Sequence, residues 1–535
     1  MAFCEQCGAK LTPESRFCEE CGAAVEFIAE ASSSKEGAAI QCGLKEIFLT
    51  RNWKDEWAQA AVDANDSELG LILTREEALL LQVDAGPVQL QELIDDYINK
   101  AAKRGVKYYY LNLDKFPGYD GEGDVDSVVS VMREVVDVAR PKYVFILGND
   151  DVVDVACWEN EAEDGDDEVD SDLCYSTLDT ESPWEGQEYD FDEVLRVGRL
   201  PTYSGEGFEK FKAYFDTAAT HIGRMDRIVP YGLSALVWEK ESNYEFGKTA
   251  SRKVDASPAV DYSNVGSRIG SEANLLFFNL HGSNRAKYWY GQDGGDYPEA
   301  VAPSVLSKIK RPYFLGVEAC YGARYLDGLT PEDSIVLTAM QNNCIVFLGS
   351  SKIAFGTSSP SGSCADLVVG SFVKCISKGE SAGDAHIAGL ERLTEDWGAL
   401  DDADIKTMAE FALYGDPSAR TGANSSLKGF KSLLSGSKVC KGLSVPMPDV
   451  GRAVHAVGVE IDAKIEAIID EYVSNEVLPE LAGTINSKNV SSKTLKMSKT
   501  GLNQKIYAFK SGALNRVAKV YFDNNGRIRK PLGSK

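Results

Sequence analysis

The sequence has few histidines, few basic residues and no long hydrophobic run. Only four of its 535 residues are histidine, and 82 acidic residues outnumber the 56 lysines and arginines. This balance argues against a surface built for nucleic acid or anionic membranes, so we expect neither as a partner. No apolar run approaches the roughly 18–20 residues that cross a bilayer. The N-terminus lacks a basic region followed by an apolar stretch, so we expect no secretory signal and a cytoplasmic protein.

Apolar and aromatic residues are abundant enough to build large cores. They make up 44% and 10% of the chain, which excludes global disorder. At roughly 100–200 residues per domain, the length predicts about two to four domains.

Four of the twelve cysteines form one pattern near the N-terminus. Two residues separate Cys4 from Cys7 and also Cys18 from Cys21, and a glycine follows each pair. Two such knuckles offer four thiolates to a tetrahedral zinc ion. Two disulfides are the alternative, which a cytoplasmic location disfavours. The segment resembles the small zinc ribbons of prokaryotic proteins, which implies a structural zinc ion and a surface for a regulatory protein partner.

The central part of the chain alternates between strand and helix patterns. Apolar strands are expected at Leu69–Thr74, Lys107–Leu113 and Tyr143–Leu147, with amphipathic helices at Val88–Arg104 and Asp124–Ala139 between them. This alternation predicts parallel strands joined by right-handed crossovers, and hence an α/β fold with a layered, mostly parallel sheet.

A second α/β stretch follows. Continuous apolar strands are expected at Asn274–Leu280, Tyr313–Val317 and Asn343–Leu348, and a helix at Glu299–Ile309. Strands of this kind belong in parallel sheets that are covered on both faces.

Charge is distributed unevenly along the chain. Residues 150–193 hold 19 acidic residues and no lysine or arginine. This segment is either a solvated, mobile loop or a calcium site, since hard cations bind several carboxylate oxygens. Residues 425–535 instead hold 18 basic and 9 acidic residues, a balance of +9. We favour a basic face docked on the acidic core over a nucleic-acid surface, because aromatic residues are few there.

Three consecutive strand ends carry chemically active side chains. His281, Cys320 and the pair Ser350-Ser351 follow the three strands of the second stretch. Loops converge at the carboxyl ends of parallel strands, so an imidazole and a thiol are expected at one edge of the sheet. A nearby imidazole can take the proton of a nucleophilic thiol. The amides of Cys320 and Gly282 can then donate to an oxyanion.

At these residues the sequence resembles the gingipain-like cysteine peptidases of the caspase clan. The resemblance also includes motifs elsewhere and covers roughly residues 108–418, but not the ribbon or the basic C-terminal part. The matching motifs are Tyr143–Asp150, Asp172–Tyr175, Val197–Pro201 and Leu413–Pro417.

The resemblance implies a cysteine peptidase with a His281/Cys320 dyad. It implies an acid that orients the histidine, for which Glu239 is the candidate. It also implies that the loop after Ser350 and Ser351 lines the P1 pocket, with Phe355 as a wall, and that calcium is a candidate cofactor. Gingipains are secreted with a signal and a propeptide, and this chain shows neither, so its regulation is expected to differ.

We therefore predict a cytoplasmic cysteine endopeptidase that is restrained by its accessory domains and acts on protein or peptide substrates. The negative core suggests a preference for Arg or Lys at P1. The alternative is a non-catalytic scaffold that recruits partners through the ribbon. The predicted segments are a ribbon at 1–26, a linker at 27–45, α/β subdomains at 46–220 and 221–421, a linker at 422–437 and a basic α+β domain at 438–535.

Overall fold

The structure of the protein is a computed structural model. It describes residues 53–64, 67–119, 121, 123–185, 191–395, 400–422, 457–459, 461–497 and 501–535. All of these residues belong to one compact unit. The four ribbon cysteines and the two predicted linkers lie outside the described residues, apart from Gly422.

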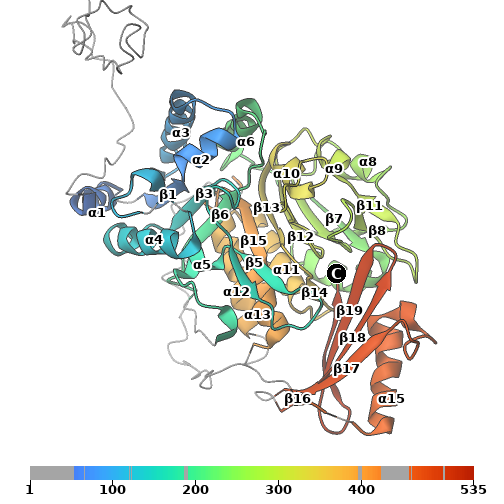
Figure 1. The fold of residues 1–535 in the computed structure, drawn as a ribbon. Helices are drawn as coiled ribbons and strands as arrows, with labels where there is room; N and C mark the ends of the chain where they lie inside the picture. Colours follow the sequence, from blue (N-terminus) through green and yellow to red (C-terminus); the bar gives the residue numbers. More distant parts are fainter. Residues whose placement is uncertain are drawn as a thin grey trace, which may run out of the picture. The chain divides into compact units, whose positions relative to one another are not determined.

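A ten-stranded sheet forms the centre of the described part (Figure 1). Its order is β2-β1-β3-β6-β15-β13-β12-β9-β7-β8, and every neighbouring pair is parallel except β13 and β15. The two predicted α/β subdomains thus share one continuous sheet, whose halves run in opposite directions. The strands are β1 (Glu68–Thr74), β2 (Val106–Asn112), β3 (Tyr143–Leu147), β6 (Arg196–Leu200), β7 (Pro230–Ala235), β8 (Asp255–Ser257), β9 (Leu275–Asn279), β12 (Tyr313–Glu318), β13 (Cys344–Ser350) and β15 (Phe411–Gly415).

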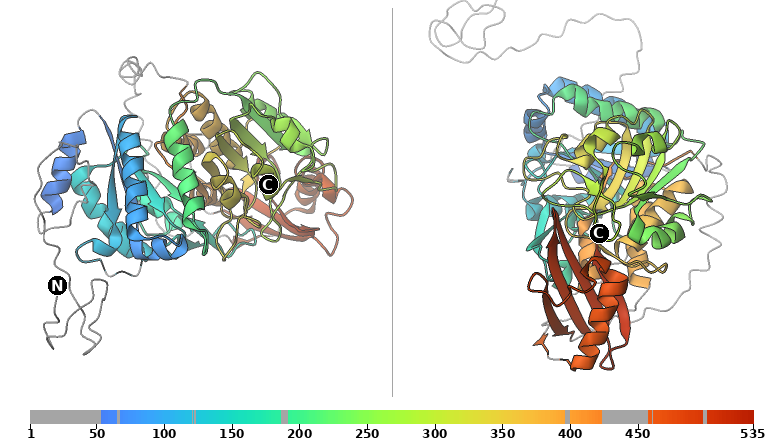
Figure 2. Two further views of the ribbon diagram at one scale, coloured as in Figure 1. Left: turned by 90° about the horizontal axis from the view of Figure 1, so that it is seen from above. Right: turned by 90° about the vertical axis from the view of Figure 1, so that its right-hand side faces the viewer.

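Helices cover both faces of this sheet (Figure 2). Their amphipathic patterns place apolar side chains inward, as in α4, where Asp124 caps the helix by accepting from the Ser127 amide. The helices are α1 (Trp53–Ala64), α2 (Glu76–Gln82), α3 (Pro87–Ala102), α4 (Val125–Ala139), α5 (Leu173–Thr177), α6 (Phe208–His221), α7 (Glu239–Phe246), α8 (Val265–Ile269), α9 (Pro303–Leu306), α10 (Ile335–Met340), α11 (Ala365–Ser377), α12 (Ala382–Glu395) and α13 (Asp402–Glu410).

The predicted fold class, a mixed α/β protein with a large and mostly parallel sheet, is confirmed. The predicted helix at 299–309 is wrong in part. That segment begins as the short strand β11 (Glu299–Val301), and the helix α9 starts only at Pro303. Proline favours the first turn of a helix and cannot continue one from before it.

A buried arginine joins three of the sequence motifs. Arg199 of β6 is fully buried, and its Nη2 atom lies 2.6 Å from Oδ1 of Asp172. Its Nη1 atom also donates to the carbonyl oxygens of Gly148 at 3.1 Å and Val153 at 2.7 Å. These contacts connect β6 to the loop after β3 and to Asp172. Residues from three of the sequence motifs therefore lie together in the structure.

Arg199→Leu is expected to lower the free energy of unfolding by about 3–5 kcal/mol, because it leaves the Asp172 carboxylate without its buried partner. Urea unfolding followed by circular dichroism measures this loss. Arg311→Leu is the matched control, since Arg311 pairs with Glu272 at an exposed site. That change should cost less than about 1 kcal/mol. Equal losses for the two variants would contradict the assigned role of Arg199.

A smaller antiparallel sheet lies at the C-terminal end of the chain, with the order β14-β20-β19-β18-β17-β16. Its outer strand β14 (Phe355–Gly356) comes from the loop after β13, so the sheet is continuous with the large domain. Helix α15 (Ala463–Tyr472) packs on it through Ile469. The other strands, called the C-terminal sheet below, are β16 (Val457–Gly458), β17 (Ser491–Lys496), β18 (Asn503–Ser511), β19 (Leu514–Phe522) and β20 (Ile528–Ser534).

The acidic segment at 150–193 is structured over much of its length. It contains the hairpin of β4 (Ala156–Glu159) and β5 (Glu168–Ser171). In the loop between these strands, Asp164 and Asp166 lie 2.6 and 2.7 Å from the Lys406 ammonium group, and all three side chains are buried or nearly so. The interpretation as a loop is therefore wrong for this hairpin, although its Glu159, Glu163, Asp167 and Glu168 are exposed. Lysine, rather than a cation from solution, neutralises these two carboxylates, and nothing here supports calcium.

None of the helices in the described ranges is both long and apolar enough to cross a membrane.

Candidate active site

His281 and Cys320 follow two neighbouring strands. β9 and β12 are parallel and adjacent, and the Leu280 amide donates to the Glu318 carbonyl oxygen at 3.0 Å. The two chains stay close beyond the strands: a Cβ atom on Gly282 would lie 1.8 Å from the Cys320 carbonyl oxygen. Only glycine permits this approach, so the predicted meeting of the two strand ends has a direct structural basis.

The His281 ring is enclosed on all sides. Its Nε2 atom lies 2.7 Å from Oε1 of Gln292, and its Nδ1 atom lies 3.2 Å from Nη1 of Arg516. The rings of Trp238 and Tyr297 lie 4.3 and 5.2 Å from its centroid. Burial, followed by the Arg516 charge, holds the His281 pKa well below its usual range. The ring is therefore neutral, and these partners favour a proton on Nε2.

Cys320 is 2% exposed, and its thiol donates to the Ala354 carbonyl oxygen at 3.6 Å. Burial raises the pKa of this thiol to about 12, and the Glu410 charge adds to the effect. Only a thiolate is an effective nucleophile. In this structure the Cys320 thiol is therefore buried and protonated at neutral pH.

Three buried carboxylates lie together at the end of β12, where Glu318 precedes Cys320 by two residues. Glu241 comes from α7, Glu318 from the end of β12 and Asp366 from α11, and all three are fully buried. Their oxygen atoms lie within 4.8 Å of one another, the one such acidic group of three found in the described ranges. We call these three residues the acidic pocket.

The acidic pocket holds the side chain of Lys535. The Lys535 ammonium nitrogen lies 2.8 Å from Oδ1 of Asp366 and 3.6 Å from Oε2 of Glu318, and 4.1 Å above the Trp238 ring. Burial alone would lower the Lys535 pKa, but the surrounding carboxylates outweigh it and raise this pKa. Burial and mutual repulsion hold the pKa values of Glu241 and Glu318 well above their usual range. The Lys535 charge opposes both of these shifts by favouring the ionised carboxylates, so the pocket favours a side chain that carries a positive charge.

Residues 3–25 match the family model of the zinc-ribbon domain. The N-terminal segment is a zinc ribbon.

No sequence among the curated proteins matches the chain. Its fold is similar to that in the crystal structure of the Arg-specific cysteine proteinase gingipain R (RgpB), with a TM-score of 0.48, 9% identity, and coverage of 87% of this chain and 97% of that chain. It is also similar to the complex of Porphyromonas gingivalis RgpB pro- and mature domains, with a TM-score of 0.47, 10% identity, and coverage of 87% and 99%. At this identity no site residue is carried over from those proteins.

Glu239 does not take the place predicted for it. It begins α7 and is partly exposed, whereas the polar groups around the His281 ring belong to Gln292, Arg516 and Lys535. Gln292 therefore occupies the position expected for an orienting acid. Its signal in the sequence is weak, because it lies 11 residues beyond the histidine in a loop.

Ser350 is the last residue of β13 and Ser351 follows it, and both hydroxyl groups donate to backbone carbonyl oxygens. The Ser350 hydroxyl donates to the Lys352 carbonyl oxygen at 2.8 Å, and the Ser351 hydroxyl to that of Asp170 at 2.8 Å. Phe355 is buried beneath the Lys519 ammonium group, with 4.9 Å between nitrogen and ring centroid. The loop contributes to the pocket through the backbone at Gly356.

Proposed function

We propose that this protein is a cysteine endopeptidase that cleaves peptide bonds after basic residues. The observation that carries the proposal is the acidic pocket at the end of β12, the strand before Cys320, which is filled by a lysine side chain. The positions of His281 and Cys320 just beyond two adjacent parallel strands support a thiol–imidazole dyad. The opposite charges of pocket and lysine support Arg or Lys at P1.

In the proposed reaction, the Cys320 thiolate attacks the carbonyl carbon of the P1 residue. The Cys320 amide donates to the oxygen that becomes negative, and His281 passes the thiol proton to the leaving amine. The products of this step are a thioester on Cys320 and a free amine. His281 then takes a proton from water, whose oxygen attacks the thioester, and the acid product leaves as the thiol is restored.

The zinc ribbon contributes no step to this reaction. Cys4, Cys7, Cys18 and Cys21 are the proposed zinc ligands, and a structural zinc ion supplies folding energy to a segment too short for its own core. We propose that the ribbon binds a regulatory protein partner. The cytoplasmic location remains part of the proposal.

A panel of fluorogenic peptides with Lys, Arg, Asp or Ala at P1 tests the function. Because Lys535 fills the pocket, wild type is measured beside Lys535→Glu, with the Cys320→Ala variant of each as control. Cleavage is expected after Lys and Arg only. Cleavage after Asp or Ala alone would refute the proposed specificity. If the Lys535→Glu chain, called the open chain below, cleaves none of the peptides, a non-catalytic scaffold is favoured.

Gly356→Ala is expected to lower kcat/KM for lysyl peptides by at least about 100-fold, because it blocks the pocket. A Cβ atom there would lie 2.0 Å from Cε of Lys535 and 2.6 Å from Oδ1 of Asp366. Gly266→Ala is the control, since its added methyl group would meet nothing within 4 Å. Steady-state kinetics in the Lys535→Glu chain check the effect. Unchanged kinetics for Gly356→Ala would place the P1 side chain elsewhere.

A further inference from the structure

The last strand of the C-terminal sheet lies along the active site as an extra strand. β20 pairs with β14 in antiparallel register, with Phe355 opposite Ser534 and Gly356 opposite Gly533. The Lys535 amide donates to the Ala354 carbonyl oxygen at 2.9 Å. Peptides often bind to proteins in this way, as an added strand at a sheet edge. Figure 1 shows the end of the chain beside β14.

The backbone of Lys535 reaches the reacting groups. The Cys320 amide donates to the Lys535 carbonyl oxygen at 3.4 Å. With the Lys535 side chain in the acidic pocket, this oxygen occupies the position proposed for the carbonyl oxygen of a P1 residue. Both the side chain and the backbone of Lys535 are therefore placed as in a bound substrate or product.

Arg516 of β19 contacts the Nδ1 atom of His281, whereas Gln292 contacts the Nε2 atom. Arg516 is fully buried, and its Nε atom pairs with Oε1 of Glu480 at 3.0 Å, while Nη1 contacts His281 Nδ1. Glu480 also accepts from the Tyr297 hydroxyl at 2.8 Å. The C-terminal sheet thus contacts both members of the dyad.

The sheet is fastened by an apolar core and by buried ion pairs. One apolar cluster joins Cys320 and Phe355 to Val517, Tyr521 and Leu532 of the sheet. The cluster includes Cys320 together with residues of the C-terminal sheet, so the sheet helps to bury the proposed nucleophile.

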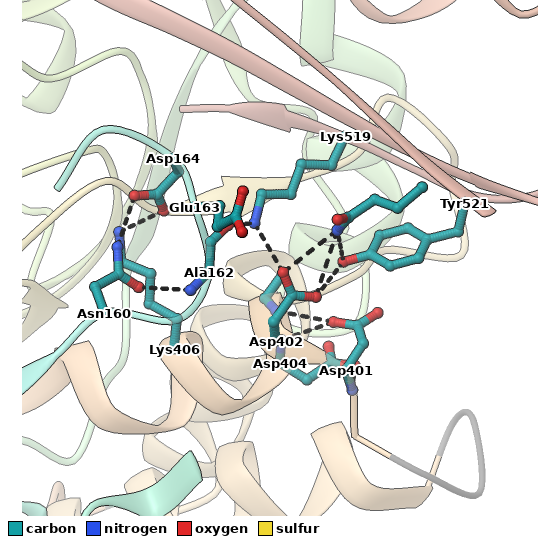
Figure 3. Close-up of polar contacts among 12 residues, drawn as sticks. Asn160, Ala162, Glu163, Asp164, Asp401, Asp402, Asp404, Lys406, Lys519 and Tyr521 are labelled. Carbon is teal, nitrogen blue, oxygen red and sulfur yellow. Dashed lines mark hydrogen bonds and ion pairs between the residues drawn. The ribbon is translucent and has the colours of Figure 1, made fainter. Parts of the chain in front are cut away.

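Ion pairs to the start of α13 complete this contact (Figure 3). Asp402 lies 3.1 Å from the Lys519 ammonium group and accepts from the Tyr521 hydroxyl at 2.6 Å. The Lys530 ammonium group lies 2.6 Å from Asp401 and 2.8 Å from Asp404. Two lysines of the basic C-terminal sheet are thus paired with aspartates at the start of α13.

We propose that the C-terminal sheet is an intramolecular inhibitor of the peptidase, in which Ile528–Lys535 binds as a substrate strand with Lys535 in the P1 pocket. This inference rests on the proposed function. A tethered segment acts at a high effective concentration, so an external peptide must compete with it at a disadvantage. Activation then requires that the C-terminal sheet leave the active site, and a partner that binds its basic face in place of Asp401, Asp402 and Asp404 has to be acidic.

The test measures access to Cys320 rather than catalysis. Full-length chains are treated with iodoacetamide, and alkylation of Cys320 is followed over time by peptide-mapping mass spectrometry. Lys535→Glu places a negative charge in the acidic pocket and is expected to raise the alkylation rate at least about tenfold. Lys535→Arg keeps the charge and is expected to react slowly, like wild type. Lys510→Glu makes the same charge change at an exposed position of β18 and is the matched control.

A second variant opposes docking without altering the pocket. Lys530→Glu faces Asp401 and Asp404 and is also expected to raise the alkylation rate of Cys320. Circular dichroism confirms that each variant is folded. The proposal is overturned if Cys320 is alkylated in folded wild type at the same rate as in Lys535→Glu and in Lys530→Glu.

The peptide panel separates this inference from the proposed function. Faster alkylation together with new cleavage of lysyl peptides supports both. Faster alkylation without cleavage of any peptide leaves the docking of the C-terminal sheet established and refutes the peptidase. If wild type and Lys535→Glu cleave lysyl peptides at the same rate and their Cys320 is alkylated at the same rate, the result supports the peptidase and refutes the inhibitor.

Discussion

Cys320→Ala in the Lys535→Glu chain is expected to reduce hydrolysis of lysyl peptides by at least about 10⁴-fold, to the background rate. The reason is that the Cys320 sulfur forms the thioester in the proposed reaction, and alanine has no nucleophilic atom. His281→Ala should cause a loss of similar order, because the two residues act as a unit and their effects are not additive. Steady-state kinetics with a lysyl peptide measure both.

Peptide binding by the Cys320→Ala chain distinguishes loss of the nucleophile from loss of the fold. The Cys320→Ala chain should still bind the lysyl peptide, since the acidic pocket is intact, and its thermal unfolding should be close to that of the parent. Cys157→Ala is the matched control, because this thiol is exposed and far from the catalytic strands in the chain. Retained hydrolysis in Cys320→Ala would exclude Cys320 as the nucleophile.

The same pair of chains should differ in the pH dependence of Cys320 alkylation. In the closed site the Cys320 pKa is about 12, chiefly through burial, so little thiolate exists at neutral pH. Opening the site removes the burial and lowers this pKa, and the midpoint of the alkylation profile therefore moves to lower pH. Rates measured from pH 6 to 10, a range chosen around the ordinary thiol pKa of about 8.5, check the direction. Identical profiles for wild type and Lys535→Glu would contradict it.

The approach of the two strand ends that carry His281 and Cys320, and much of the fold, could be predicted from the sequence because they rest on local patterns. Tyr143–Leu147 is strand β3 with the predicted bounds, and the strands before His281 and Cys320 begin and end within a residue or two of their predicted positions. Continuous apolar runs have few alternatives in a covered parallel sheet, and parallel order alone brings the two strand ends together.

The acidic pocket and the inhibitory strand were not accessible in this way. Glu241, Glu318 and Asp366 are far apart in sequence and meet only through the packing of α7 and α11 on the sheet. β20 carries Lys530 and Pro531, a composition typical of an exposed edge or a turn. Its lysine is buried only because carboxylates from another domain neutralise it, and no local pattern reports that pairing.

Asp366→Asn is expected to have opposite effects in the two states of the chain. In the open Lys535→Glu chain it should lower kcat/KM for lysyl peptides by about 10- to 100-fold, since it removes a negative charge that faces the ammonium group of the P1 lysine. In the wild-type chain it should weaken the hold on Lys535, whose ammonium group lies 2.8 Å from Asp366, and so speed alkylation of Cys320. Asparagine keeps the shape of the side chain and its contact with the Thr357 amide.

These opposite signs distinguish substrate recognition from general damage to the site. A variant that merely loosened the fold would lower cleavage in both chains, and its alkylation would rise in the open chain as well. Asp333→Asn, at an exposed position, is the matched control and should change neither quantity. If Asp366→Asn lowers lysyl cleavage but leaves wild-type alkylation slow, the pocket recognises substrates while other contacts close the site. If it alters neither, Lys535 does not occupy the P1 pocket in solution, and the link between the pocket and both proposals is broken.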